Sequence, residues 1–186
     1  MDAVDAAQRG STAPQLLVLS GLPGTGKSTL ARGLAPRLGA AWLRIDTIEQ
    51  GLRELCGVAV EGEGYELAYR LAGDQLRAGV SVIADSVNPI ALTRAGWRGV
   101  AEGLGLRALD VEVHCSDPVE HRCRVETRAA EVPGLRLPDW SAVRARDYEP
   151  RDDAPIRIDT AGVPPAVSLD ALCAALAAAG FPGHAP

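Results

Sequence analysis

One eight-residue segment constrains this chain more than any other feature. Residues 21–28 have the sequence Gly-Leu-Pro-Gly-Thr-Gly-Lys-Ser and match the pattern G-x-x-x-x-G-K-[ST]. An apolar run over 15–20 precedes the segment, and residues 29–38 follow it with leucines at helical spacing. Glycines let successive backbone N–H groups turn toward phosphate oxygens, and the N-terminus of the following helix adds its dipole. The sequence therefore predicts a buried strand, a phosphate-binding loop and a helix, in that order.

The side chains of this loop have distinct expected roles. Lys27 is expected to reach the β- and γ-phosphates, and the Ser28 hydroxyl to ligate Mg²⁺. Of the 19 Lys and Arg residues, Lys27 is the one lysine. A chain that otherwise uses arginine therefore keeps a compact ammonium at this position. We predict that ATP and Mg²⁺ bind at this loop, with GTP left open as the nucleotide. The expected nucleotide contacts are Gly21, Leu22, Pro23, Gly24, Thr25, Gly26, Lys27, Ser28 and Thr29.

Strands and helices alternate along the rest of the chain. Apolar periodicity predicts further strands at 42–45, 80–84, 110–115 and 155–159, and helices at 47–55, 64–78, 88–103, 117–130, 141–148 and 167–179. Asn88 is expected to cap the helix that starts at Pro89. This alternation predicts an α/β fold with a parallel sheet covered on both faces. Ligands of such sheets bind where the strands end, which is where Gly21, Asp46 and Asp85 lie.

A chain of 186 residues with a net charge of −5 fits one α/β domain. We assign residues 15–179 to that domain, 1–14 and 180–186 to tails, and about 122–140 to a short lid, because 131–139 is rich in Pro and Gly. The net charge argues against broad binding to nucleic acid, which needs a basic face. The sequence shows neither a secretion signal nor a span long enough for a membrane. We expect a cytoplasmic monomer or homodimer.

Asp46 and Asp85 each follow a predicted strand. A carboxylate at Asp46 can accept a proton from an attacking hydroxyl or hold that hydroxyl in line with the γ-phosphate. The alternative is an N-cap for a helix starting at Thr47, with Glu49 completing a capping box. Asp85 is expected to hold Mg²⁺ through water, and the alternative is that it caps the next turn.

Arginines follow the fourth predicted strand. Arg124 and Arg128 are four residues apart and are expected to share a helical face beside the lid loop. Lid closure would then bring both guanidinium groups to the transferring phosphoryl group, where charge develops. The alternative is a solvated face in which arginines pair with Glu120 and Glu126, and this suits Arg122 better than the other two.

At these residues the chain resembles the small bacterial P-loop kinases of the AAA_33 group. This group includes the kinase domain of polynucleotide kinase, zeta toxin, gluconate kinase and chloramphenicol phosphotransferase. The matching segments are 19–29, 44–46, 82–85, 124–128 and 157–160. The resemblance implies a three-layer P-loop NTPase fold, a five-stranded parallel sheet in the order 2-3-1-4-5, and a short helical lid. It also implies phosphoryl transfer from ATP to a hydroxyl, with Asp46 as the acceptor-side base and Thr160 near the adenine.

One position departs from the polynucleotide kinase pattern, in which an arginine three residues after the catalytic Asp binds a phosphate. This chain has Glu49 there, which would repel a phosphate and suits a hydroxyl or an amine, although Arg53 can turn toward the same pocket. We therefore expect a small-molecule acceptor: a sugar, polyol, aminocyclitol or antibiotic. The expected acceptor-side residues are Asp46, Glu49, Arg53, Asp85 and Asn88, with Tyr65, Tyr69 and Trp97 as further candidates.

Other functions stay open at this point. One is a kinase of a polynucleotide or nucleoside 5′-hydroxyl. Another is a regulatory ATP-binding protein whose nucleotide state switches a partner's affinity and which phosphorylates no substrate. A toxin kinase rests on analogy of fold alone. The short chain and the acid at the acceptor position favour an enzyme.

Overall fold

The computed structural model describes residues 13–149, 151 and 154–181. All of its helices and strands lie within the proposed domain bounds of 15–179. Of the tails predicted at 1–14 and 180–186, residues 1–12 and 182–186 lie outside the described residues. The elements are β1 (Leu16–Ser20), α1 (Lys27–Leu38), β2 (Ala41–Arg44), α2 (Ile45–Cys56), α3 (Glu63–Arg77), β3 (Val82–Asp85), α4 (Ala91–Glu102), β4 (Ala108–His114), α5 (Pro118–Thr127), α6 (Trp140–Arg144), β5 (Ile156–Asp159) and α7 (Pro165–Ala178).

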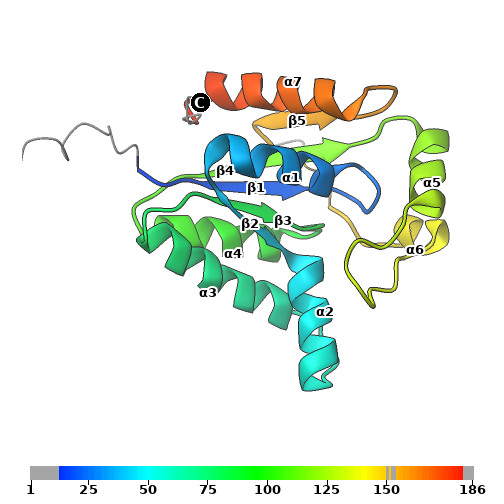
Figure 1. The fold of residues 1–186 in the computed structure, drawn as a ribbon, viewed down its shortest axis with the longest axis horizontal. Helices are drawn as coiled ribbons and strands as arrows, with labels where there is room; N and C mark the ends of the chain where they lie inside the picture. The colour runs from blue at the N-terminus through cyan, green and yellow to red at the C-terminus, as the bar shows by residue number, and fades with distance from the viewer. Residues whose placement is uncertain (1–12, 150, 152–153, 182–186) are drawn as a thin grey trace, which may run out of the picture.

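The strands form one parallel sheet in the order β2-β3-β1-β4-β5, which confirms the predicted fold class and strand order. In the centre, Leu16 of β1 lies opposite Val82 of β3 and Ala108 of β4. Every residue of β1 is buried, because helices cover both faces of the sheet, and this explains its unbroken apolar sequence. The carboxyl ends of all strands meet at one edge (Figure 1).

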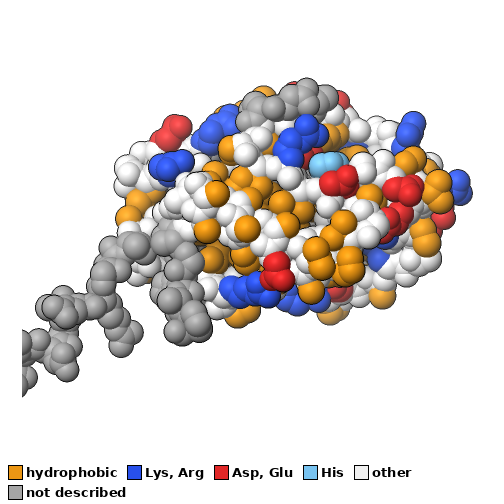
Figure 2. Space-filling view, turned by 90° about the horizontal axis from the view of Figure 1, so that it is seen from above, with side chains coloured by type: hydrophobic (Ala, Val, Ile, Leu, Met, Phe, Trp, Pro, Cys, Tyr) orange, Lys and Arg blue, Asp and Glu red, His pale blue; other side chains and the backbone are white. Residues whose placement is uncertain are grey.

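Two helical layers enclose the sheet (Figure 1). On one face, Leu34 of α1 packs in a buried cluster with Leu172 and Leu176 of α7. On the other face, Trp97 of α4 packs with Ala68 of α3. Seen from above, hydrophobic side chains gather near the middle of the surface and charged ones lie around them (Figure 2). None of the helices in the described ranges has the length and apolar character needed to cross a membrane.

The predicted cap at Asn88 is wrong, and so is the cap considered as the alternative role of Asp46. The helix α2 begins at Ile45, so Asp46 lies in its first turn, and the N-cap residue is Arg44 with no side-chain cap bond. The helix α4 begins at Ala91, whereas Asn88 lies outside it with a left-handed φ of 52°. Asn88 instead donates its side-chain amide to Ser20 Oγ at 2.9 Å. Bonds to distant segments therefore outweigh the local capping preference at this position.

The end of α5 also differs from expectation. Asp117 caps this helix as predicted, since its carboxylate accepts from the N–H groups of Val119 and Glu120. The helix stops at Thr127, and Arg128 has an extended backbone with ψ of 141°. Arg128 therefore does not share a helical face with the arginine one turn before it. The chain continues as a loop over 128–139 and a short α6.

Candidate functional site

A cavity of about 1520 Å³ lies at the edge where the parallel strands end. Its lining combines the loop after β1 with α2, α3, α5 and the lid loop. Most of the predicted site residues line it, namely Pro23, Gly24, Gly26, Lys27, Ser28, Thr29, Asp46, Glu49, Arg53, Asp85, Arg124, Arg128 and Thr160. The sheet edge thus brings together side chains that come from both halves of the chain.

The loop after β1 requires glycine where it meets its neighbours. Gly21 and Gly24 have φ of 143° and 86°. A Cβ at Gly21 would lie 2.1 Å from the Val113 carbonyl oxygen of β4, and a Cβ at Gly24 would lie 2.6 Å from a methyl group of Val125 in α5. Inside the loop, Lys27 Nζ donates to the Leu22 carbonyl at 2.9 Å. The ammonium is therefore held in the concave side of the loop, where successive N–H groups can meet phosphate oxygens.

Lys27 and Asp85 form the electrostatic centre of the cavity. Both are buried, and burial lowers the pKa of Lys27 and raises the pKa of Asp85, while the attraction between the two opposes each shift. The Ser28 hydroxyl also stabilises the Asp85 carboxylate, and Trp42 Nε1 donates to Asp85 Oδ2 at 3.2 Å. A hydroxyl and a carboxylate beside a phosphate loop are the oxygen donors that Mg²⁺ prefers, so these residues fit the expected ion.

Asp46 and Arg128 lie within electrostatic range of one another in the cavity. Burial lowers the pKa of Arg128, and the negative charge of Asp46 opposes this shift. The Arg128 Nε is buried and makes no hydrogen bond within the described residues. The Asp46 side chain is 50% exposed and lies 4.0 Å from Arg44 Nε. Both side chains therefore have hydrogen-bonding capacity left for a ligand in the cavity.

Arg124 has a different environment from Arg128. Its guanidinium donates to the Thr160 hydroxyl at 2.8 Å and to the Thr160 carbonyl at 2.7 Å, and it pairs with Glu120. The Thr160 hydroxyl in turn lies 3.0 Å from the Thr25 carbonyl oxygen. Thr160 thus joins α5 to the phosphate loop. Arg122, by contrast, is exposed and pairs with Glu126 at 2.9 Å, as the solvated alternative predicts.

The end of the cavity where we expect the acceptor is lined by residues of α2 and α3. Glu49 and Arg53 form an ion pair of 2.8 Å on α2, and burial raises the pKa of Glu49 while Arg53 opposes the rise. Because the Glu49–Arg53 pair has no net charge, Glu49 does not by itself repel an anion from this part of the cavity. Tyr65 and Tyr69 of α3 also line this end.

Two of the candidate acceptor residues lie behind the wall of the cavity. Asn88 is fully buried, and its backbone N–H donates to the Tyr65 hydroxyl at 2.9 Å. Trp97 is fully buried in the core beneath α4 and meets Tyr69 edge to face. The structure therefore places both as supports for the tyrosines that line the pocket.

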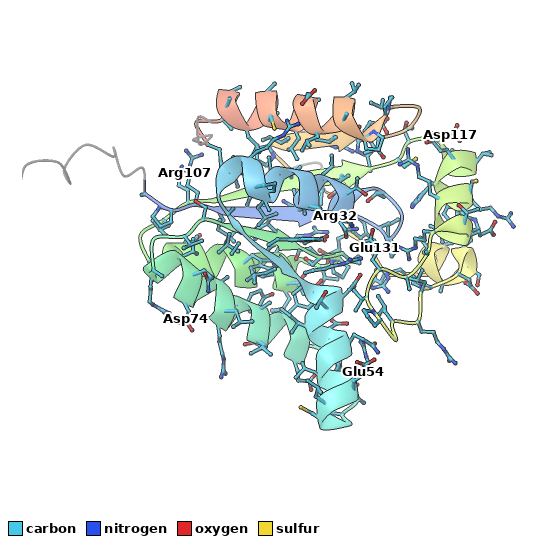
Figure 3. The ribbon with its side chains drawn as sticks, viewed as in Figure 1. Arg32, Glu54, Asp74, Arg107, Asp117 and Glu131 are labelled. Carbon is cyan, nitrogen blue, oxygen red and sulfur yellow. The ribbon has the colours of Figure 1, made fainter. Side chains whose placement is uncertain are left out.

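The loop over 128–139, which we predicted to be part of a lid, lines the cavity and is held by residues that sequence reasoning missed. Glu131 accepts from Arg44 at 2.9 Å and pairs with Arg32 of α1, which faces it in Figure 3. These arginines hold the pKa of Glu131 below its usual range. Gly134 has φ of 72°, and a Cβ there would lie 2.1 Å from Glu54 Oε1, so the loop lies directly on α2. The ion pairs join positions 87 and 99 residues apart, a distance at which local patterns carry no signal.

The sequence profile of the AAA_33 family, described as an AAA domain, matches residues 16–146. A shikimate kinase from Gloeobacter violaceus is 33% identical over 165 residues, which are 84% of this chain and 89% of that protein. An uncharacterized protein of Mycobacterium tuberculosis is 34% identical over 164 residues, which are 80% of this chain. The chain spans about a third of the length of this and the other mycobacterial relatives, since the match covers 32% of each.

Solved structures of kinases have the same fold. A gluconokinase from Sinorhizobium meliloti superposes with a TM-score of 0.65 at 20% identity, covering 90% of this chain and 94% of that one. The APS kinase of Mycobacterium tuberculosis, in complex with AMPPNP and APS, superposes with a TM-score of 0.64 at 18% identity, covering 89% of this chain and 98% of that one. At these identities the likeness concerns the fold, which is the kinase-like P-loop architecture.

Proposed function

The chain belongs to the AAA_33 family, and on that premise we propose that it is an ATP-dependent kinase that transfers the γ-phosphoryl group to a hydroxyl of a small molecule. One observation carries the proposal above all others. Asp46 is a half-exposed carboxylate in the cavity that makes no helix cap, and it acts electrostatically on both Lys27 and Arg128. A carboxylate in such surroundings has the chemistry of a proton acceptor for a hydroxyl substrate.

The nucleotide end of the cavity supports ATP as the phosphoryl donor. The loop over 21–28 would hold the phosphates, with Lys27 moving from the Leu22 carbonyl to the β- and γ-phosphates. Ser28 and Asp85 would hold Mg²⁺, which when bound neutralises charge on the phosphates. Thr160 and Arg124 form the wall on which we place the nucleoside. The AMPPNP complex of the structurally similar APS kinase is consistent with this use of the fold.

The transfer we propose uses the chain's own residues as follows. Asp46 accepts the proton of the acceptor hydroxyl as that oxygen bonds to the γ-phosphorus. The bond between the γ-phosphorus and the oxygen bridging it to the β-phosphate breaks, and ADP leaves with that oxygen. Lys27 and Arg128 stabilise the charge on the phosphoryl oxygens during transfer. The lid loop, held down by Glu131, excludes water that would otherwise hydrolyse ATP.

The names of the relatives favour a small hydroxylated acceptor over a nucleic acid, since a shikimate kinase matches in sequence and a gluconokinase in fold. The neutral pairing of Glu49 with Arg53 leaves both charged and uncharged acceptors to be tested. A nucleic-acid 5′-hydroxyl remains the comparison class for the assay.

Acceptor-dependent release of ADP from ATP and Mg²⁺ tests the proposal. The panel contains sugars, polyols, gluconate, shikimate, aminoglycosides, nucleosides and 5′-hydroxyl oligonucleotides, and mass spectrometry identifies the phosphorylated product. We expect a small molecule to raise ADP release and to gain one phosphoryl group. Phosphorylation of oligonucleotides alone would move the assignment to a nucleic-acid kinase. Tight ATP binding with no stimulation by any acceptor would favour a regulatory ATP-binding protein.

A further inference from the structure

The acceptor end of the cavity contains a cation that the proposed transfer does not use. Arg146 follows α6 and lines the same cavity as Asp46. Its positive charge acts on the Glu49 carboxyl and the Tyr65 phenol, and in each case it opposes the rise in pKa that burial causes. Arg146 therefore lines the cavity within electrostatic range of Glu49 on α2 and Tyr65 on α3. No hydrogen bond or ion pair joins it to another residue of the described ranges.

Of the other arginines that line this cavity, Arg128 is used in the proposed transfer, Arg136 belongs to the loop over 128–139, and three have carboxylate or backbone partners. Arg53 pairs with Glu49 at 2.8 Å, Arg44 pairs with Glu131 at 2.9 Å, and Arg124 is held by Glu120 and Thr160. Two further carboxylates, Glu61 and Glu66, also line the cavity, and neither forms an ion pair with Arg146. At the acceptor end, Arg146 thus carries a positive charge that no ion pair within the described residues neutralises. The neighbouring Glu49–Arg53 pair has no net charge.

The segment that carries Arg146 is anchored to the body of the domain. The Tyr148 hydroxyl bonds to the carboxylate oxygens of Glu112 in β4, at 2.7 and 2.8 Å. The Glu149 backbone N–H donates to the Pro89 carbonyl at 2.9 Å, and the Glu149 carbonyl accepts from Arg94 of α4 at 2.6 Å. These bonds fix the chain two and three residues after Arg146, whereas the lid loop is held by exposed ion pairs. Arg146 is therefore presented by a preorganised segment, as a binding residue requires.

We propose that the phosphoryl acceptor carries an anionic group, a carboxylate or a phosphate, and that Arg146 binds this group while the acceptor hydroxyl faces Asp46. The inference rests on the proposed kinase function and names its substrate class. A guanidinium forms two parallel hydrogen bonds with either anion, and its charge persists at every physiological pH. The pairing of Glu49 with Arg53 leaves the charge of Arg146 for the substrate.

Matched acceptors and matched variants test this assignment. The acceptors are sorbitol, gluconate and sorbitol 6-phosphate, which share one six-carbon skeleton, and a second set consisting of an uncharged cyclitol, its carboxylate analogue and its phosphate ester. The variants are Arg146→Gln, Arg146→Lys and a control, Arg144→Gln, at an exposed position of α6 outside the cavity lining. Comparison of the carboxylate and phosphate members shows which anion the pocket takes.

A charge-assisted hydrogen bond is worth a factor of roughly 10 to 100 in affinity. We expect Arg146→Gln to lower kcat/KM for the charged acceptors by about that factor, mainly through KM, and to have a much smaller effect on uncharged acceptors. Arg146→Lys should keep part of the preference, since the charge remains but the two parallel bonds do not. Arg144→Gln should behave as the wild type.

Equilibrium binding separates this inference from the kinase assignment. Calorimetric titration of each acceptor into the protein loaded with AMPPNP reports on the pocket without turnover. Tighter binding of charged than of uncharged acceptors, lost in Arg146→Gln but kept in Arg144→Gln, supports the inference even where no phosphoryl transfer occurs, and that absence would count against the kinase function alone. Equal binding of charged and uncharged acceptors, equal effects of the two glutamine variants, or no binding of any charged acceptor would overturn the inference.

Discussion

Replacement of Asp46 by Asn separates a chemical role from a structural one. The carboxylate is half exposed, caps no helix, and lies 4.0 Å from Arg44 Nε. An exposed ion pair contributes roughly 0.2–1 kcal/mol, and a negative charge in the first turn of a helix about 0.3–1 kcal/mol. We therefore expect the free energy of unfolding to fall by about 1 kcal/mol, which lowers Tm by roughly 2–4 °C in a chain of this size.

The expected effect of the same substitution on catalysis is far larger. Asparagine keeps the size of the side chain and its ability to orient a hydroxyl, but it cannot accept a proton. Loss of general-base catalysis lowers kcat by about 10²–10⁴-fold, equivalent to about 3–5 kcal/mol in the activation free energy. The affinity for ATP should stay the same or rise slightly, because the lost carboxylate repels the phosphates.

Three measurements decide the outcome: kcat with the best acceptor of the panel, the dissociation constant for ATP, and chemical denaturation. Asp117→Ala is the control, since Asp117 does cap a helix and lies outside the cavity lining. Its loss should lower the free energy of unfolding by about 0.5–2 kcal/mol and change kcat little. The assignment of Asp46 as the proton acceptor fails if Asp46→Asn keeps the kcat of the wild type, or if its loss of activity is matched by a loss of folded protein.

Three further perturbations address other parts of the site. Lys27→Ala should lower phosphoryl transfer by at least about 10²–10³-fold in the ADP-release assay, and full activity would remove the loop from the reaction. Arg128→Ala should lower kcat by a similar factor and the ATP affinity much less, so equal losses would indicate a role in ground-state binding. Glu131→Gln should raise the equilibrium constant for opening of the loop over 128–139 about fivefold, because exposed ion pairs contribute on the order of 1 kcal/mol in total. Hydrogen exchange over 131–139 measures this change. Because the pKa of Glu131 is lowered in the folded protein, the wild-type contacts are complete above the ordinary glutamate pKa of about 4.3 and are lost as the pH falls through the lowered value. In Glu131→Gln, the protection factors of residues 131–139 should not change with pH in that window.

Local features of the sequence predicted the central part of the fold well. The glycine loop, its strand and its helix are adjacent in the chain, so one short segment contains all the signals that specify them. Asp117 followed by Pro118 is another such case, and its cap is confirmed. The strand order required the family resemblance, because periodicity identifies strands but does not say which ones become neighbours.

Predictions failed where distant segments decide the local conformation. Asn88 before a proline has the composition of a helix cap, yet its bonds to Ser20 and Tyr65 draw it into the interior. The pairing of Glu131 with Arg32 and the position of Arg146 depend on how the lid and the segment after α6 fold back across the sheet edge. Arginine is common in this sequence, so residue type alone could not distinguish a pocket arginine from a solvated one.

The central position of β1 has a consequence for the way this protein responds to ligands. This strand is paired on both sides, and the phosphate loop continues directly from it, so fluctuations that expose its amide hydrogens require most of the domain to open. The loop over 128–139 is tied mainly by exposed ion pairs and can open by itself. We therefore expect that nucleotide binding, as proposed, orders the loop over 128–139 and leaves the sheet beneath unchanged. A substrate-induced change in exchange rates should map onto the lid and leave β1 as slow as before.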